Sequence, residues 1–518
     1  MSLARTGTWA IFATAGAVGA TGLYLTFGLV ASVLQPTSVR EGASDPRRSA
    51  LTQPAPTPPV PASAGAQTAA LEPNASPVPE QTPPTASLAP PNEGVPVDTG
   101  EPVEIEVADP KVISVGGAGG GQGTRGLVIL HIGDNHTSAD FLTGELRRRL
   151  QARFGRGGTG YMTAGHPHIG VRSSTMKITA SSGWTYKSLQ KSDARVGEFW
   201  LSGYNAVATA AGETMTFASE TPLTFDAIEI EAIGQPGGGA IDIKLNGSIS
   251  AHYDLASARI EPVAIRLSPV RGPTDKVQEV AVTTTGSGTV SLSSVSIYNS
   301  RSGVTYNSVG YVGAQIGLLS KMNEKNLASD LVRIDPQIVV LSFGTNEASN
   351  EHLDIAQYTK VYERVVNRVQ TALPNAAIAI ISPPDFNETP PGCSKDKEAG
   401  CRTSEPKIAS STASAKAARA LASAEDCGAW RAPAKLAQIR EAQRDIAQRY
   451  NLVYWNWASI MPSECGAHQW FTASPPLMGR DHVHFTAEGY TRSAEQFLNV
   501  LLPMIEKVRV GGNVISKD

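Results

Sequence analysis

After about residue 125, short apolar runs alternate with amphipathic helical patterns, and this alternation limits the fold more than any other feature of the chain. The run from Leu127 to Ile132 is almost entirely apolar, which is typical of a strand buried on both faces of a parallel sheet. Further strands are predicted at 338–343, 377–381 and 453–457, and helices at 141–154, 355–373, 436–450 and 487–508. The pattern predicts an α/β fold with an open parallel sheet.

The first of these helices carries a cluster of basic side chains, namely Arg147, Arg148, Arg149 and Arg153. Charged side chains on an amphipathic helix usually face water. We therefore expect all four arginines to point outward from the helix at 141–154.

Between about residues 175 and 305 the helical periodicity disappears. Apolar and polar residues alternate instead, for example at 227–231 and 240–245, and Gly, Pro and Asn separate these stretches. This pattern predicts an all-β module, most simply a sandwich. Because strand and helix alternation resumes afterwards, we expect the module to be inserted into an α/β domain formed by residues 125–174 and 306–510.

The N-terminal segment at residues 8–34 contains no charged residue. Its apolar stretch of about 25 residues is long enough to cross a bilayer as a helix. It also exceeds the apolar core of an ordinary cleaved signal peptide, which is the alternative interpretation. We expect a retained, single-pass transmembrane anchor.

The next segment, residues 35–124, is rich in Pro, Ala and Gly. Residues 35–115 alone hold 17 of the 35 prolines in the chain. Such a composition cannot bury a core and is typical of an extended, disordered tether. The sequence therefore predicts a linker between the anchor and the folded part of the chain.

Charge and cysteine content limit the possible binding partners and the cellular compartment of the protein. The formal net charge is -3, and no long basic block occurs, which argues against nucleic acid as a partner. The four cysteines are Cys393, Cys401, Cys427 and Cys465. They suit two disulfides in an oxidising compartment, with reduced buried cysteines as the alternative. The simplest pairing is Cys393 with Cys401 and Cys427 with Cys465.

Three separate blocks supply groups for acyl transfer, which needs a base, a group that orients the base, and donors for a developing oxyanion. His484 is the candidate base, and Asp481, three residues earlier, can accept a hydrogen bond from its other ring nitrogen. Asn346 follows a predicted strand and can donate its side-chain amide. The backbone N–H of Gly313 is a candidate second donor, since a residue without a side chain lets a carbonyl approach closely.

These blocks resemble the signature blocks of SGNH (GDSL-type) hydrolases, which in this chain are Gly133-Asp134-Asn135-His136-Thr137, Gly313, Gly344-Thr345-Asn346-Glu347 and Asp481-His482-Val483-His484-Phe485. The continuation at 140–160, with Phe-Gly-x-Gly-Gly-x-Gly at its end, is more narrowly similar to periplasmic peptidoglycan O-acetylesterases, which carry a β module between the first two blocks.

The resemblance implies Gly313 and Asn346 as oxyanion donors, Asp481 as the orienting group and His484 as the base, with Asp134 and Asn135 in the nucleophile block. It also implies an SGNH-hydrolase fold with a flavodoxin-like parallel sheet, and an envelope glycan such as peptidoglycan as the partner. The inner membrane would hold the anchor, with the C-terminal domain in the periplasm. We expect no cofactor and no metal ion.

The chain departs from the family at the nucleophile, because Asn135 stands where these enzymes have serine. A carboxamide cannot form an acyl-enzyme. Three interpretations remain: the protein only binds a glycan; His484 activates water directly, or Ser138 substitutes as nucleophile; or the site uses carboxylate chemistry, with acid and base among Asp134, Glu347 and Asp481. The leading prediction is an ester hydrolase acting on acyl groups of an envelope glycan, with a non-standard nucleophile position.

Overall fold

The structure is a computed structural model that describes residues 111–115, 126–192, 198–269, 275–299, 303–389, 400–402, 429–463 and 465–514. The predicted transmembrane anchor at 8–34 and most of the predicted linker lie outside the described residues. Within the described ranges, no helix combines the length and the apolar character needed to span a membrane.

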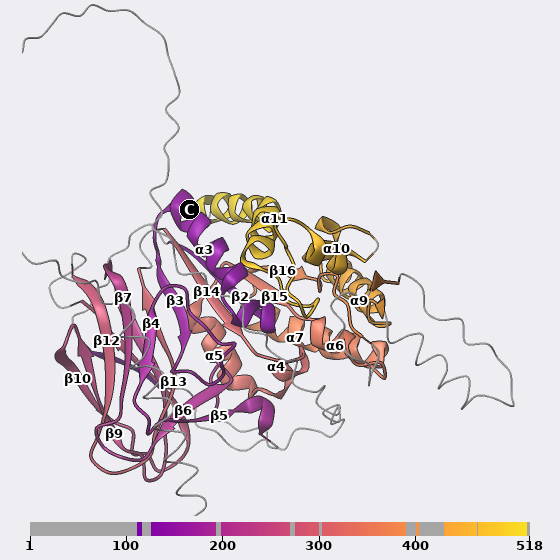
Figure 1. Cartoon of the computed structure of the whole chain (residues 1–518). Helices are drawn as coiled ribbons and strands as arrows, with labels where there is room; N and C mark the ends of the chain where they lie inside the picture. Colours follow the sequence, from indigo (N-terminus) through magenta and orange to yellow (C-terminus); the bar gives the residue numbers. More distant parts are fainter. Residues whose placement is uncertain are drawn as a thin grey trace, which may run out of the picture. The chain divides into compact units, whose positions relative to one another are not determined.

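A five-stranded parallel sheet forms the centre of the α/β part (Figure 1). In spatial order its strands are β14 (Val304–Gly310), β2 (Leu127–Gly133), β15 (Ile338–Ser342), β16 (Ala377–Ile381) and β19 (Val453–Trp455). All seven residues of β2 are buried, as expected for a central parallel strand. The predicted open parallel sheet is therefore present, with β14 as an additional edge strand that the sequence pattern did not indicate.

Alternate residues of the central strand face two different helical layers. Leu130 and Ile132 pack in one apolar core with the helices α5 (Glu324–Ile334), α7 (Ile355–Ala372) and α9 (Leu436–Arg449). Leu127 and Ile129 pack in a second core with α3 (Phe141–Phe154) and α11 (Ala487–Val514), which lie side by side (Figure 1). The two-residue period of a strand thus buries the sheet on both faces.

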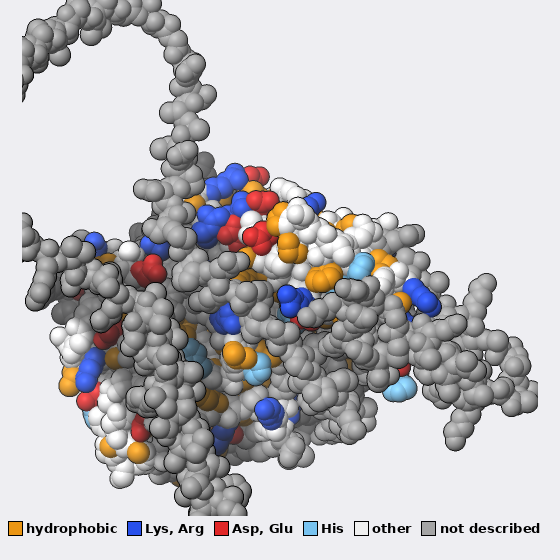
Figure 2. Space-filling model, in the orientation of Figure 1, with side chains coloured by type: hydrophobic (Ala, Val, Ile, Leu, Met, Phe, Trp, Pro, Cys, Tyr) orange, Lys and Arg blue, Asp and Glu red, His pale blue; other side chains and the backbone are white. Residues whose placement is uncertain are grey.

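The outward orientation predicted for all four arginines of α3 is wrong for Arg147. Its guanidinium is buried, pairs with Asp140 at 3.0 Å and donates from Nε to the Tyr306 carbonyl at 3.1 Å. Burial alone would raise the pKa of Asp140, but the charge and hydrogen bonds of Arg147 lower it. Arg148 does face water, beside Glu145. Over α3 and α11 the surface shows charges of both signs (Figure 2).

The strands between the two parts of the α/β sheet form two further sheets with their own apolar core. The first contains β11 (Glu261–Leu267), β8 (Ala227–Gly234), β13 (Val290–Tyr298), β6 (Tyr204–Ala208), β5 (Thr185–Ser188) and, paired with β13, β3 (Gly158–Thr163). The second contains β10 (Ser248–Asp254), β9 (Ala240–Leu245), β12 (Lys276–Thr285), β7 (Thr214–Thr224) and β4 (Lys177–Ala180). The strand β3 lies in the first of these sheets, although the sequence placed it in the α/β domain.

The predicted linker also needs a correction at its end. Residues Lys111–Val115 form the strand β1, which pairs in parallel with β11. Ile113 packs against the apolar core of the two sheets, whereas Val112 is exposed. A short β-branched run can add to a sheet edge through backbone hydrogen bonds alone, whatever the composition of the chain before it.

A buried acidic cluster joins the first of these sheets to α5. Arg333 of α5 forms ion pairs with Glu229, Glu231 and Asp330, and the Tyr161 hydroxyl donates to Glu231 at 2.5 Å. Burial raises the pKa of Glu231 to about 7 and also raises that of Asp330. Burial thus favours the protonated forms of Glu231 and Asp330, which lessens the repulsion among the three carboxyl groups around one guanidinium.

Candidate active site

His484 and Asp481 form a hydrogen-bonded pair on the loop before α11. The ring Nδ1 lies 2.7 Å from Asp481 Oδ2, while Oδ1 accepts from the backbone N–H groups of Val483 and His484 at 3.0 and 2.9 Å. Burial alone would raise the pKa of Asp481, but these bonds, the ring contact first, lower it to about 2. A carboxylate at this position fixes the proton of His484 on Nδ1, so Nε2 is the free acceptor.

Asn135 reaches this acceptor from the other side of the site. The strand β2 ends at Gly133, and the short helix α2 (Asn135–Ser138) begins directly after it. The Asn135 amide Nδ2 lies 3.4 Å from His484 Nε2, and its Oδ1 accepts from the Gly313 N–H at 2.5 Å. The carboxamide therefore bridges the candidate base and the candidate oxyanion donor. The structure brings Asn135, Gly313 and His484 together.

The conformation of Gly313 explains the need for glycine there. Its φ is 70°, in the left-handed region that glycine adopts without strain. A Cβ atom at this position would meet only Gln190 Nε2, at 3.7 Å, so space alone does not require glycine. The same Gln190 amide donates to the Gly313 carbonyl at 3.1 Å and fixes the orientation of the loop.

Two residues of the Gly344–Glu347 block hold the next residues of this loop. Asn346 Nδ2 donates to the Ala314 carbonyl at 2.8 Å, and Glu347 Oε1 accepts from the Ile316 N–H at 2.7 Å. Asn346 therefore lies against the donor loop, but its amide bonds to the backbone of that loop and not to Asn135. In this arrangement its visible role is to support Gly313.

The remaining candidate carboxyl groups do not face the site. Asp134 is buried, accepts from the His136 N–H at 3.1 Å and is also hydrogen-bonded by Thr345. Burial raises the pKa of Asp134 to about 6 and that of Glu347 to about 8. Because both groups are buried and accept backbone N–H bonds, the geometry argues against the carboxylate interpretation, in which they would act on a bound substrate.

A small cavity, open to solvent, borders both Asn135 and His484. Its other walls are mainly apolar, and they include Ala139, Phe141, Val312, Phe485 and Tyr490. Ser138 also borders the cavity, but its hydroxyl donates to the backbone carbonyl of Asn135 at 3.2 Å. The site thus offers a small apolar chamber beside the candidate base.

The side chain of His482 anchors the loop that carries Asp481 and His484 to the residues packed against it. This fully buried ring stacks on Trp430 with centroids 3.8 Å apart, and its Nε2 lies 3.1 Å from His468 Nδ1. Burial lowers the pKa of His482 to about 4, so the ring is neutral at physiological pH.

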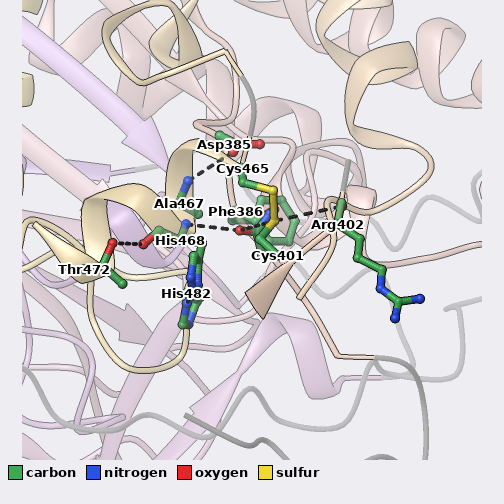
Figure 3. The surroundings of a disulfide bond; sticks show 10 residues. Asp385, Phe386, Cys401, Arg402, Cys465, Ala467, His468, Thr472 and His482 are labelled. Carbon is green, nitrogen blue, oxygen red and sulfur yellow. Dashed lines mark hydrogen bonds between the residues drawn. A yellow bond between two sulfur atoms is a disulfide. The ribbon is translucent and has the colours of Figure 1, made fainter. Parts of the chain in front are cut away.

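A disulfide between Cys401 and Cys465 lies next to this support, with Cα atoms 6.0 Å apart (Figure 3). The predicted partners were therefore wrong for both of these cysteines. Cys401 lies on β17 (Gly400–Cys401), which pairs with β18 (Ala429–Trp430), and Cys465 directly precedes α10 (Gly466–Thr472). These segments are remote in sequence, so spacing alone does not indicate the bond. Cys393 and Cys427 lie outside the described residues.

The GDSL-like lipase/acylhydrolase family matches residues 293–492, a range that includes Gly313, Asn346 and His484 and begins after Asn135. The chain carries a GDSL-like lipase/acylhydrolase domain of the SGNH superfamily. Among solved structures, one described as "Peptidoglycan O-acetylesterase in action" is 25% identical, with a TM-score of 0.56 over 74% of this chain and 92% of that chain.

Carbohydrate esterases are also similar at lower identity. A family 2 enzyme with a carbohydrate-binding domain from Corynascus thermopiles (Myceliophthora fergusii) is 12% identical, with a TM-score of 0.26 over 64% of this chain and 100% of that chain. A family two enzyme from Clostridium thermocellum in complex with cellohexaose is 9% identical, with a TM-score of 0.25 over 63% and 100%. No curated protein matches the chain in sequence.

Several residues of the GDSL-like site were not indicated by the sequence. Gln190, which holds Gly313, comes from a short 3₁₀ helix more than 100 residues away in the chain. The sequence also did not indicate that Trp430 stacks on His482. Phe485 was part of the quoted block at 481–485, and a large aromatic residue directly after the base is the one signal that could have pointed to a cavity wall.

Proposed function

We propose that this protein acts on acyl esters, O-acetyl groups first, of peptidoglycan or another envelope glycan, with His484 and Asp481 activating a water molecule. The observation that carries the proposal is the convergence of the Asp481–His484 pair and the Gly313 N–H on the side chain of Asn135, which borders a solvent-open cavity together with His484. The likeness to a peptidoglycan O-acetylesterase supports the substrate class. The β region between residues 175 and 305 is proposed as an inserted, carbohydrate-binding-like module.

In this mechanism His484 Nε2 takes a proton from water, and Asp481 stabilises the imidazolium that forms. The water attacks the acyl carbon of the ester, whose carbonyl oxygen becomes negative. The Gly313 N–H can stabilise that oxygen only after the Asn135 carboxamide has moved away from it. The resident asparagine therefore competes with the substrate for the donor.

This competition favours a second candidate function, in which the protein binds an acylated glycan without cleaving it. Asn135 offers no nucleophilic atom and occupies the Gly313 donor at 2.5 Å. The apolar chamber would then hold the acyl group of a bound glycan as a recognition pocket.

We also propose that the protein is tethered to the inner membrane by residues 8–34, with the folded part in the periplasm. The uncharged apolar run, the Pro-rich segment after it and the disulfide between Cys401 and Cys465 support this location. Fractionation, followed by alkylation of the cysteines before and after reduction, tests it. A reduced protein in the cytoplasmic fraction would contradict it.

The experiment that separates the two functions uses the full chain with O-acetylated peptidoglycan and with the same glycan after alkaline removal of its esters. Hydrolysis predicts release of acetate by the wild type and none by His484→Ala. Recognition alone predicts no acetate and sedimentation of the protein only with the acetylated glycan. If the protein neither releases acetate nor binds the acetylated glycan preferentially, both functions are contradicted.

A further inference from the structure

The carboxamide of Asn135 is held as an amide substrate is held in a hydrolase. Its carbonyl oxygen accepts the Gly313 N–H at 2.5 Å, where an oxyanion would be stabilised. Its nitrogen lies 3.4 Å from His484 Nε2, where a leaving amine would receive a proton. The side chain of the protein therefore fills both polar positions that a scissile amide needs.

A path for the attacking group is also present. The small cavity borders both Asn135 and His484 and opens to solvent, so water reaches the amide and the base together. Asp481 fixes His484 with Nε2 as the free acceptor, which is the form able to take a proton from water.

From this geometry we infer that Asn135 is a site of self-catalysed deamidation, which converts it to aspartate. Water adds its oxygen to the side-chain carbonyl carbon while His484 Nε2 takes one water proton, and the carbonyl oxygen carries the negative charge at the Gly313 N–H. His484 then delivers the proton to the amide nitrogen, the carbon–nitrogen bond breaks, and ammonia leaves. The products are a carboxylate at position 135 and ammonium, with no change of oxidation state.

The ordinary route to deamidation is disfavoured at this position. That route needs the backbone nitrogen of the next residue, His136, to attack the Asn135 side chain and form a cyclic imide. The His136 N–H instead donates to Asp134 Oδ1 at 3.1 Å, within the helical turn of α2. Direct attack by water gives only aspartate, whereas the cyclic imide also gives isoaspartate, so the product identifies the route.

The consequence is chemical as well as structural. A carboxamide cannot attack an ester, but a carboxylate is one of the side chains that act as covalent nucleophiles. This inference rests on the site and not on the proposed function, because deamidation needs no external ester or glycan. A protein that does not deamidate could still act on a glycan, and a protein that does not act on a glycan could still deamidate.

The test is mass spectrometry of the purified full chain after incubation in water enriched in heavy oxygen, with digestion in ordinary water. Trypsin releases the peptide 126–147, in which Asn135 is the only side-chain amide. We expect this peptide to gain the mass of an amide converted to a carboxylate, with one heavy oxygen and no isoaspartate. In His484→Ala and Asp481→Asn, each checked for folding by circular dichroism, the conversion should slow by about 10²- to 10⁴-fold.

An internal control comes from the peptide 245–259, whose only side-chain amide is Asn246. Asn246 is followed by Gly247 in an exposed turn, and its carboxamide bonds to the backbone of residues 276–279, so His484 plays no part in its conversion. Asn246 should convert at the same rate in all variants, so its conversion is an internal reference for the incubation time. An unchanged Asn135 after Asn246 has converted would overturn the inference. Equal conversion of Asn135 in wild type and His484→Ala, or isoaspartate at position 135, would overturn it as well.

Discussion

Replacing Asn135 with serine tests how much of an esterase site this chain retains. The serine Oγ would occupy the place of the asparagine Cγ, and the carboxamide beyond it would be gone. This frees the Gly313 N–H from its 2.5 Å bond and gives His484 Nε2 a hydroxyl to deprotonate in place of an amide at 3.4 Å. One substitution therefore supplies a nucleophile and an empty oxyanion donor together.

The magnitude follows from the two changes. Losing the nucleophile of a catalytic triad costs on the order of 10⁶ in rate, and one oxyanion donor is worth about 10² to 10³. Because the Asn346 amide is bonded to the Ala314 carbonyl, the second side-chain donor is not yet aimed at the site. We therefore expect a gain in kcat/KM of about 10³- to 10⁵-fold, below the full value of a mature triad.

The assay is hydrolysis of a chromogenic acetate ester by the full chain, with Asn135→Ala as the matched control. Alanine also frees the Gly313 N–H but offers no hydroxyl, so it isolates the contribution of water. The double variant Asn135→Ser with His484→Ala should return to the background rate. A folded serine variant that is no faster than the alanine variant would refute the proposed roles of His484 and Gly313.

Three predictions concern stability. Burial raises the pKa of Glu347 from 4.5 to about 8, so the folded state binds the proton more tightly than the unfolded state. The contribution of Glu347 to stability should then be fully present below about pH 4.5 and be lost at about 1.4 kcal/mol per pH unit up to about pH 8. Glu347→Gln should flatten this dependence in thermal unfolding, and an unchanged profile would contradict it. The Cys401–Cys465 disulfide closes a separation of 64 residues, so replacing both with serine should cost about 4 kcal/mol in denaturant unfolding; a loss below about 1 kcal/mol would contradict the bond. Arg147→Met leaves Asp140 buried without its ion pair and should cost about 3 to 5 kcal/mol, whereas Arg148→Met on the exposed face should cost almost nothing.

The parallel sheet was predictable wherever burial leaves a periodic signal. The strands at 127–133 and 377–381 are nearly continuous apolar runs, and the helices at 141–154 and 355–372 carry an apolar stripe. The edge strand β14 carries no such signal, because it buries polar side chains. Its Asn307 is fully buried and bonds to the Ile129 carbonyl at 3.1 Å, an interaction that depends on the assembled sheet.

The convergence of the site was predictable for a topological reason. Gly133 and Ser342 end neighbouring parallel strands, so the residues after them meet at the same edge of the sheet. The sequence could not reveal what holds each group there. Gln190 and Glu347 act through single hydrogen bonds to a distant loop, and the disulfide joins segments remote in the chain.

The asparagine is matched to the site that surrounds it. Its carboxamide is a donor at one end and an acceptor at the other, and it faces an acceptor at His484 Nε2 and a donor at Gly313 N–H. Leucine has a similar shape but would leave both partners unsatisfied, and aspartate would face Nε2 without a proton to donate. The match holds only while His484 carries its single proton on Nδ1.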